Sequence, residues 1–258
     1  YGTGPAPRIW GIKAQSGAGV SNVRIEDLFF KPSVDYANEG IGWRAVGRNN
    51  TIRKCRFEKL TMAWAIEPPD GSPGGHIKNF VIEDCRVQDT KTVGTGHSQG
   101  GYQQGFEDLI IRRCHFNRVG KVNNQYDHGL YLNGNSISAT IEECIVSTDG
   151  SVGIQCRGGR YNVINNLVMK CAFGITFGSG TNKKECGGKF LNNTVLYGRD
   201  LGSDPISCGI GLAMIEDGTE VANNIVAYKR GSSAPSNFGG ISYGNPEATE
   251  YTSLINPT

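Results

Sequence analysis

The sequence NTIRKCRF at residues 50–57 is one copy of a pattern that recurs along most of the chain. Each copy has an apolar residue, a cysteine or an asparagine three positions later, and a second apolar residue two positions after that. The copies follow one another at intervals of 22 to 31 residues. A period of this length, with β-branched and aromatic residues and no helical spacing, predicts a solenoid built of strands. The middle column of the pattern reads Cys55, Cys85, Cys114, Cys144, Asn166, Asn193 and Asn224.

A second strand precedes most copies of the pattern and usually begins with glycine, as in GLYL at 129–132. Alternation along a strand predicts that Leu130 points inward and that Tyr131 points outward. Each coil is therefore expected to hold two or three short strands, and the coils to stack into parallel sheets about 4.8 Å apart per rung. Because the repeat runs from end to end, we predict a single domain over residues 1–258.

The composition narrows the class of protein. A net charge of +2 gives no reason to expect nucleic acid or a membrane surface as a partner. The 37 glycines are about twice the usual share, which suits many tight corners between short strands. The chain begins with YGTG and stops at NPT in mid-pattern, so we expect it to be a fragment of a longer protein.

The eight cysteines divide into two groups. Four lie in the repeat column, where a cysteine behaves as a small buried hydrophobe, so we predict stacked free thiols and neither disulfides nor a metal site. The asparagines that replace them later in the column are expected to bond to one another and to turn backbone. The cysteines outside the column, whose pairing the sequence does not indicate, are Cys156, Cys171, Cys186 and Cys208.

The ladder of Ile-x-x-(Cys/Asn)-x-(Phe/Val) with Gly-Ile-x-Leu strands resembles the right-handed parallel β-helix proteins of the pectate-lyase-like superfamily. The resemblance covers nearly the whole chain and implies an all-β, single-stranded right-handed parallel β-helix of about eight to nine coils. That superfamily includes polysaccharide lyases, glycoside hydrolases, epimerases and phage tailspikes. It implies a polysaccharide partner, a monomer or homotrimer, and a secreted (extracellular or periplasmic) location or a virion surface.

Several motifs of that superfamily are missing from this sequence. There is no Trp-Ile-Asp-His signature of the best-known pectate lyases, no clear calcium-binding Asp cluster, and no polygalacturonase set. We therefore expect neither of these two activities and carry over no catalytic residue from them. No cofactor is expected, and Ca²⁺ is left open because the sequence lacks a clear group of ligands.

The segment QYDHGLY at 125–131 contains the largest group of candidate catalytic side chains. His128 is predicted to face a groove and to act as a base, with Asp127 orienting its ring. The alternative is that His128 caps the strand by bonding turn backbone of a neighbouring coil. Tyr131 is a candidate proton donor or a stacking platform for a sugar, with a contact between rungs as the alternative. Arg157 is a candidate to neutralise a uronate carboxylate.

Outward-facing rows and long insertions supply the candidate binding residues. We predict one row of Ala65, Tyr131, Gln155 and Thr176, and a second row of Arg44, Glu67, Asn133 and Arg157. The insertion at 89–107 adds His97, Tyr102, Gln103 and Gln104, whose register the sequence does not fix. The predicted substrate-binding residues are Arg44, Glu67, Gln155, Asn133, Tyr126 and His97. An ion pair between Arg44 and Glu67 is the alternative for these two.

Three classes of function follow from these residues. The first is a lyase that cleaves a uronate-containing glycan by β-elimination, with Arg157 or Arg44 neutralising the carboxylate, His128 taking the C5 proton and Tyr131 or Tyr126 protonating the leaving oxygen. The second is a glycoside hydrolase that uses Glu67 and Asp127 as a carboxylate pair. The third is a non-catalytic structural or glycan-binding β-helix, such as a tailspike segment, virion protein or adhesin.

Overall fold

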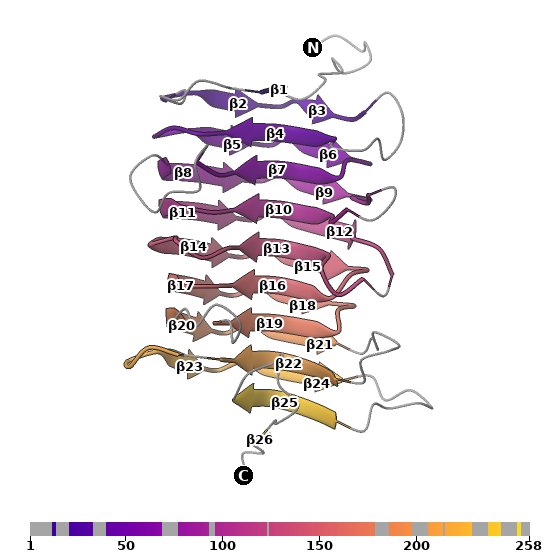
Figure 1. Ribbon diagram of the computed structural model, residues 1–258, viewed down its shortest axis with the longest axis vertical. Helices are drawn as coiled ribbons and strands as arrows, with labels where there is room; N and C mark the ends of the chain where they lie inside the picture. The colour runs from indigo at the N-terminus through magenta and orange to yellow at the C-terminus, as the bar shows by residue number, and fades with distance from the viewer. Residues whose placement is uncertain are drawn as a thin grey trace.

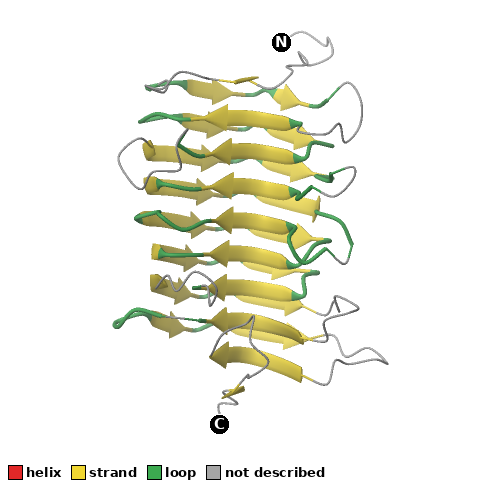
Figure 2. Ribbon diagram, in the orientation of Figure 1, coloured by secondary structure: helices red, strands yellow, loops and turns green. Residues whose placement is uncertain are grey.

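In the computed structural model the chain winds into coils that stack along one axis (Figure 1). Strands of successive coils pair to form three sheets that run along this axis. The structure describes residues 12–13, 21–32, 40–68, 77–92, 96–122, 124–178, 186–197, 206–213, 215–228, 237–243 and 252–253. In this part of the chain the regular elements are strands (Figure 2), and no helix there could cross a membrane.

The chain visits the three sheets in turn, one strand in each per coil. Sheet 1 contains β1 (Ile12–Lys13), β4 (Ile41–Ala45), β7 (Met62–Ile66), β10 (Gln99–Gln103), β13 (His128–Leu132), β16 (Val152–Cys156), β19 (Phe173–Phe177), β22 (Ile206–Leu212), β25 (Asn237–Tyr243) and β26 (Thr252–Ser253). Sheet 2 contains β2 (Arg24–Glu26), β5 (Thr51–Arg53), β8 (Ile77–Glu83), β11 (Phe106–Arg112), β14 (Ser138–Glu142), β17 (Gly159–Ile164), β20 (Cys186–Leu191) and β23 (Glu220–Ala222). Sheet 3 contains β3 (Phe29–Phe30), β6 (Arg56–Glu58), β9 (Arg86–Gln88), β12 (His115–Val119), β15 (Ile145–Thr148), β18 (Leu167–Met169), β21 (Thr194–Tyr197) and β24 (Ile225–Tyr228).

Among the described strands, all pairings are parallel except that of β25 with β26, so the predicted parallel β-helix is confirmed. The triplets from β1–β3 to β22–β24 make eight coils, and β25 begins a ninth. Each coil thus holds three strands, at the upper end of the expected two or three. The interior repeats because in-register pairing places each apolar residue above its counterpart, such as Ile52 on Ile82 and Phe57 on Val87.

The cysteine and asparagine column forms the corner between sheets 2 and 3. The residue before each member, such as Asp84 or Asn192, has a positive φ near 56°, which turns the chain sharply. The four column cysteines are free and buried, as predicted, and so are the four cysteines whose pairing the sequence left open. In the first half of the column each thiol donates to the carbonyl two residues earlier and to one on the preceding coil, at 3.3–3.8 Å for Cys55 and Cys85.

Asparagines take over this corner in the later coils and form the expected ladder. The side-chain amide of Asn166 donates to Oδ1 of Asn193 over 3.0 Å, and that of Asn193 donates to Oδ1 of Asn224 over the same distance. Asn166 also accepts from the backbone N–H of Cys144 at 2.9 Å. The amide can donate and accept at once, so it pairs backbone groups that the tight corner would leave unsatisfied.

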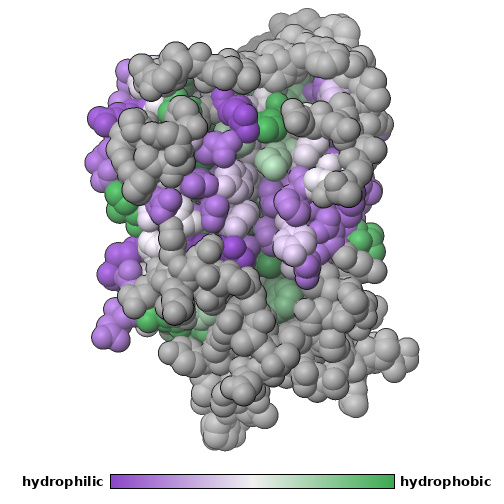
Figure 3. All heavy atoms as spheres, viewed as in Figure 1, coloured by the Kyte–Doolittle hydropathy of each residue, from purple (hydrophilic) through white to green (hydrophobic). Residues whose placement is uncertain are grey.

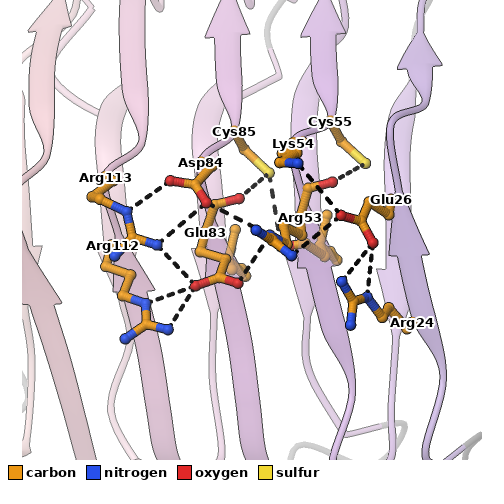
Figure 4. A network of polar contacts seen from close by, with 12 residues as sticks. Arg24, Glu26, Arg53, Lys54, Cys55, Glu83, Asp84, Cys85, Arg112 and Arg113 are labelled. Atoms are coloured by element: carbon orange, nitrogen blue, oxygen red, sulfur yellow. Dashed lines mark hydrogen bonds and ion pairs between the residues drawn. The ribbon is translucent and has the colours of Figure 1, made fainter.

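The outer face of sheet 2 carries a ladder of charges in its first half (Figure 4). Signs alternate from rung to rung because Glu26, Arg53, Glu83 and Arg112 are paired in register. The guanidinium of Arg112 lies 2.7 Å from Glu83, and that of Arg113 lies 2.7 Å from Asp84. These residues make the outer face of sheet 2 a charged surface.

Candidate functional site

The outer face of sheet 1 carries two polar rows over β7, β10, β13 and β16 (Figure 1). Strand pairing places Arg44, Ala65, Tyr102, Tyr131, Gln155 and Thr176 in the first row. The second row, two positions further along the strands, contains Glu67, Gln104, Asn133 and Arg157. Figure 3 shows this face from the same side, with hydrophilic and intermediate surfaces over its middle strands. We call Tyr102, Gln104, His128, Tyr131, Asn133, Gln155 and Arg157 the sheet 1 cluster.

The prediction that Arg44 belongs to the second row is wrong. Arg44 lies beside Ala65 in the first row, because the glycine equivalent to Gly129 is Gly42 and not Gly40. A Cβ on Gly42 would lie 2.7 Å from the Phe57 ring, which shows that position 42 faces the core. The guanidinium of Arg44 nevertheless reaches along the face and lies 2.8 Å from the Glu67 carboxylate, so the expected ion pair is present.

Two tyrosines and two amides form the centre of the sheet 1 cluster. The rings of Tyr102 and Tyr131 meet edge to face with 5.5 Å between centroids. The amide of Asn133 donates to the Tyr102 hydroxyl over 2.9 Å and to the Gln104 carbonyl over 3.2 Å. The Tyr131 hydroxyl donates to Oδ1 of Asn133 over 3.3 Å. Burial raises the pKa of Tyr102, so its phenol stays protonated near neutral pH.

His128 lies beneath this centre and is only 6 % exposed. Its ring meets that of Tyr131 at 4.9 Å, and its Nε2 accepts from the Gln155 amide at 3.0 Å. The ring proton therefore sits on Nδ1, which has no hydrogen-bond partner among the described residues. Burial, followed by the nearby charges of Arg157 and His97, lowers the pKa of His128 to about 3. The imidazole is consequently neutral and a weak base at neutral pH.

The prediction that Asp127 orients the His128 ring is wrong. The two carboxylate oxygens of Asp127 accept from the backbone N–H groups of Ser98 and Lys121, at 2.8 and 2.7 Å. Burial raises the pKa of Asp127 although these two bonds favour its ionised form. Asp127 therefore fixes the loop before β13 to the neighbouring coil and takes no part in the ring's hydrogen bonding.

Arg157 follows β16 and lies at that edge of the sheet 1 cluster. Its guanidinium lies 5.4 Å from the centroid of the Tyr131 ring, as in a cation–π contact. It also donates to the Gln155 carbonyl over 3.1 Å, so Gln155 links Arg157 to His128. Four of the predicted residues, Tyr131, His128, Gln155 and Arg157, thus converge on one spot.

Three other predicted residues, His97, Tyr126 and Gln103, make no hydrogen bond to these four side chains among the contacts that the structure shows. His97 and Tyr126 are both exposed and contact each other, with 4.9 Å between ring centroids, next to the start of β10 and β13. Gln103 points inward, where its carbonyl accepts from the indole N–H of Trp64 at 2.5 Å. Residues 93–95 of the long insertion lie outside the described residues.

The sequence placed Tyr102 and Gln104 in the long insertion but did not assign them to an outward-facing row or a role. The signal was present, because GGYQ at 100–103 pairs in register with GLYL at 129–132. A Cβ on Gly100 would meet the Phe116 ring at 2.8 Å, as at the equivalent inward-facing glycines of β4, β13, β16 and β19, whose added Cβ atoms would also meet core side chains. The described residues contain no group of three or more His, Cys, Asp or Glu side chains that could hold a metal ion.

Comparison with protein families gives one match. The family model described as "Right handed beta helix region" matches residues 11–195. The search of curated proteins finds no match, and neither does the search of solved structures.

Proposed function

Because the chain belongs to the family of right-handed β-helix proteins, we propose that it binds a uronate-containing polysaccharide on the outer face of sheet 1 and cleaves it by β-elimination. The observation that supports this proposal is the convergence of Tyr131, Arg157, Gln155 and His128. A phenol, a guanidinium and an amide within reach of one sugar ring are the groups that such chemistry needs.

In this proposal the Arg157 guanidinium binds the uronate carboxylate and withdraws charge from it, which makes the C5 proton more acidic. Tyr131, which lies beside this guanidinium, acts as the base in its deprotonated form and takes that proton. The electrons left at C5 form the C4=C5 double bond as the bond from C4 to the glycosidic oxygen breaks. Tyr131 then returns its proton to the departing oxygen, so no further reactant is needed.

His128 changes role relative to the sequence prediction. Its Nε2 is occupied by Gln155, and its lowered pKa makes it a poor proton acceptor at neutral pH. We assign it to positioning Tyr131, whose ring it contacts, and Gln155, whose amide it accepts. Asn133 and Gln104 hold the phenols of Tyr131 and Tyr102 in place on the other side.

The test is the ultraviolet absorbance of the unsaturated uronate during incubation with polygalacturonate, alginate and other uronate polymers. The proposal expects a rise in absorbance that Tyr131→Phe abolishes and that Tyr126→Phe, an exposed tyrosine of the same coil, leaves unchanged. A rise that survives Tyr131→Phe contradicts the assigned base. Absence of both a rise and new reducing ends in the wild type contradicts cleavage altogether.

Non-catalytic glycan binding is the second candidate, and a specific observation favours it. The Tyr102 and Tyr131 hydroxyls already have amide partners, and such a ladder offers aromatic rings and amides to a sugar without any chemistry. Affinity electrophoresis in gels that contain the same polymers would detect retardation without cleavage.

The geometry gives no support to the carboxylate-pair hydrolase. Glu67 is paired with Arg44, and Asp127 is bonded to two backbone amides. Glu67 is in register with Asn133, six residues beyond Asp127, so the two carboxyl groups are about 20 Å apart along the strand direction. Hydrolysis with two carboxylates requires them at about 5 to 9.5 Å.

A further inference from the structure

The outer face of sheet 2 contains a concavity of about 380 Å³, away from both the sheet 1 cluster and the charge ladder. It crosses β11, β14, β17 and β20, and its volume lies within the range of small-molecule sites. Its lining includes Ile110, Thr140, Asn162, Arg160 and Lys189. The floor consists of an in-register row that runs from Ile110 through Thr140 and Asn162 to Lys189.

The lining offers the groups that recognise a sugar acid. Thr140 and Asn162 present a hydroxyl and an amide, which can each donate to and accept from sugar hydroxyls. Lys189 and Arg160 supply two cations at the edge. Their ion pairs within the protein are weak, because the Lys189 pair is 3.8 Å long with both side chains more than half exposed. A uronate carboxylate can therefore replace the present partner at little cost.

The ion pair of Arg160 is also exposed and therefore weak. Its guanidinium lies 3.2 Å from Glu216, while the Arg160 side chain is 64 % exposed. Exposed pairs of this sort contribute little to stability, so they do not hold the cation away from a ligand.

The concavity is joined to the sheet 1 cluster by a corner without side chains. Arg157 belongs to the cluster and Arg160 to the concavity, and the two residues between them are Gly158 and Gly159. Both have positive φ, and a Cβ on Gly159 would lie 2.5 Å from the Ser136 carbonyl oxygen, so glycine is required there. Three residues span at most about 10 Å, and the two rungs from β17 to β11 add about 10 Å more, so a ligand that occupies both sites must be longer than a few sugar residues.

We propose that this concavity is a second binding site for the same acidic polysaccharide, which passes over the Gly158–Gly159 corner from the sheet 1 cluster. The inference rests on the proposed function. Since the two sites are linked by one ligand chain, occupation of the second raises affinity for long polymers only. Short oligosaccharides reach the sheet 1 cluster alone and gain nothing from it.

The experiment compares Thr140→Trp, which fills the concavity, with Thr51→Trp, which lies in the same outward row three strands away and outside the concavity. The probes are polygalacturonate and alginate, each as polymer and as purified trisaccharide. Thr140→Trp is expected to weaken polymer binding about tenfold, seen as a higher KM or Kd, and to leave the trisaccharide unaffected. Thr51→Trp should change neither. Circular dichroism and thermal melting check that both variants fold.

Lys189→Gln provides a second variant that leaves the core untouched, and it is expected to weaken polymer binding in the same direction. Unchanged polymer affinity in folded Thr140→Trp and in Lys189→Gln overturns the second site while leaving the proposed function in place. A wild type that binds polymer without cleaving it overturns the lyase mechanism, and the affinity comparison still decides the second site. A wild type that neither binds nor cleaves any polymer overturns both.

Discussion

The outer faces of sheets 1 and 2 are built by the same coils but use in-register stacking in different ways. On sheet 2, Arg53, Glu83 and Arg112 stack with alternating sign, so each charge meets its opposite on the next rung (Figure 4). On sheet 1, the rings of Tyr102 and Tyr131 on neighbouring rungs meet edge to face, and their hydroxyls are hydrogen-bonded to the side-chain amide of Asn133. The first arrangement satisfies its own charges, whereas the second leaves rings and amides for a ligand.

The comparison shows that a repeating backbone does not make a repeating function. Alternating charge lowers the pKa of Asp84 through its hydrogen bond with Arg113, so the ladder is most stable when fully ionised. Tyrosine and amide groups carry no net charge, and Arg157 at the edge of that face supplies a cation beside a ring. Chemistry is therefore expected on sheet 1, while the charge ladder of sheet 2 is expected to serve stability.

The largest effect is expected from Tyr131→Phe, which removes only the hydroxyl. Because the proposed proton transfer depends on that oxygen, kcat should fall about 100-fold or more with little change in KM. Melting temperature should change little, since the ring contacts with Tyr102 and His128 remain. Steady-state kinetics on polygalacturonate or alginate measure this effect, and an unchanged kcat would remove Tyr131 from the mechanism.

The next largest effect concerns His128 and acid. Its pKa is lowered from 6.5 to about 3 in the folded protein, so the unfolded chain binds a proton more readily. The free energy of unfolding is therefore unaffected above pH 7 and falls as the pH decreases from about 6.5 towards 3. At pH 5 the loss amounts to about 2 kcal/mol, from roughly 1.4 kcal/mol per unit.

The variant His128→Gln should show a flatter dependence of stability on pH over that range. Urea unfolding at pH 7 and pH 5 measures the difference for both proteins. Equal pH dependence in wild type and variant would show that the imidazole is not held neutral by burial.

Arg157→Lys should have a smaller effect, with kcat/KM lowered about tenfold because lysine lacks the planar fork that binds a carboxylate. Arg113→Lys is the matched control, since it changes an arginine of the charge ladder. We expect that control to leave kinetics unchanged. A loss of activity of equal size in both variants would mean that the two faces do not differ in function.

The smallest effect is expected from Glu83→Gln. Its carboxylate contacts three arginines, of which Arg112 is the nearest at 2.7 Å. Partial burial opposes its ionisation, but the hydrogen bond and charge of Arg112 outweigh it and lower the Glu83 pKa. Removal of the charge should cost about 1 kcal/mol in urea unfolding, less at high salt, and leave polysaccharide binding unchanged. Loss of binding would assign the ladder a role in recognition.

The fold could be predicted because the interior must repeat. Every column of the pattern in the described part of the chain stacks in register, from Ile52 on Ile82 to Asn193 on Asn224. The candidate site could be predicted only in part. Tyr131, Gln155 and Arg157 were found from alternation along single strands, but Tyr102 and Gln104 sit behind a long insertion that hides their register.

The spacing of residues within one coil is enough to predict the β-helix, the inward or outward facing of strand residues, and the position of the cysteine and asparagine column. The hydrogen-bond partners of the polar side chains on this β-helix depend on the tertiary structure. Asp127 accepts a hydrogen bond from Ser98 on another coil, and His128 is neutral because it is buried, with Arg157 and Gln155 beside it. These contacts join residues 27 to 29 positions apart. Their geometry therefore depends on the register between successive coils, which the lengths of the insertions affect.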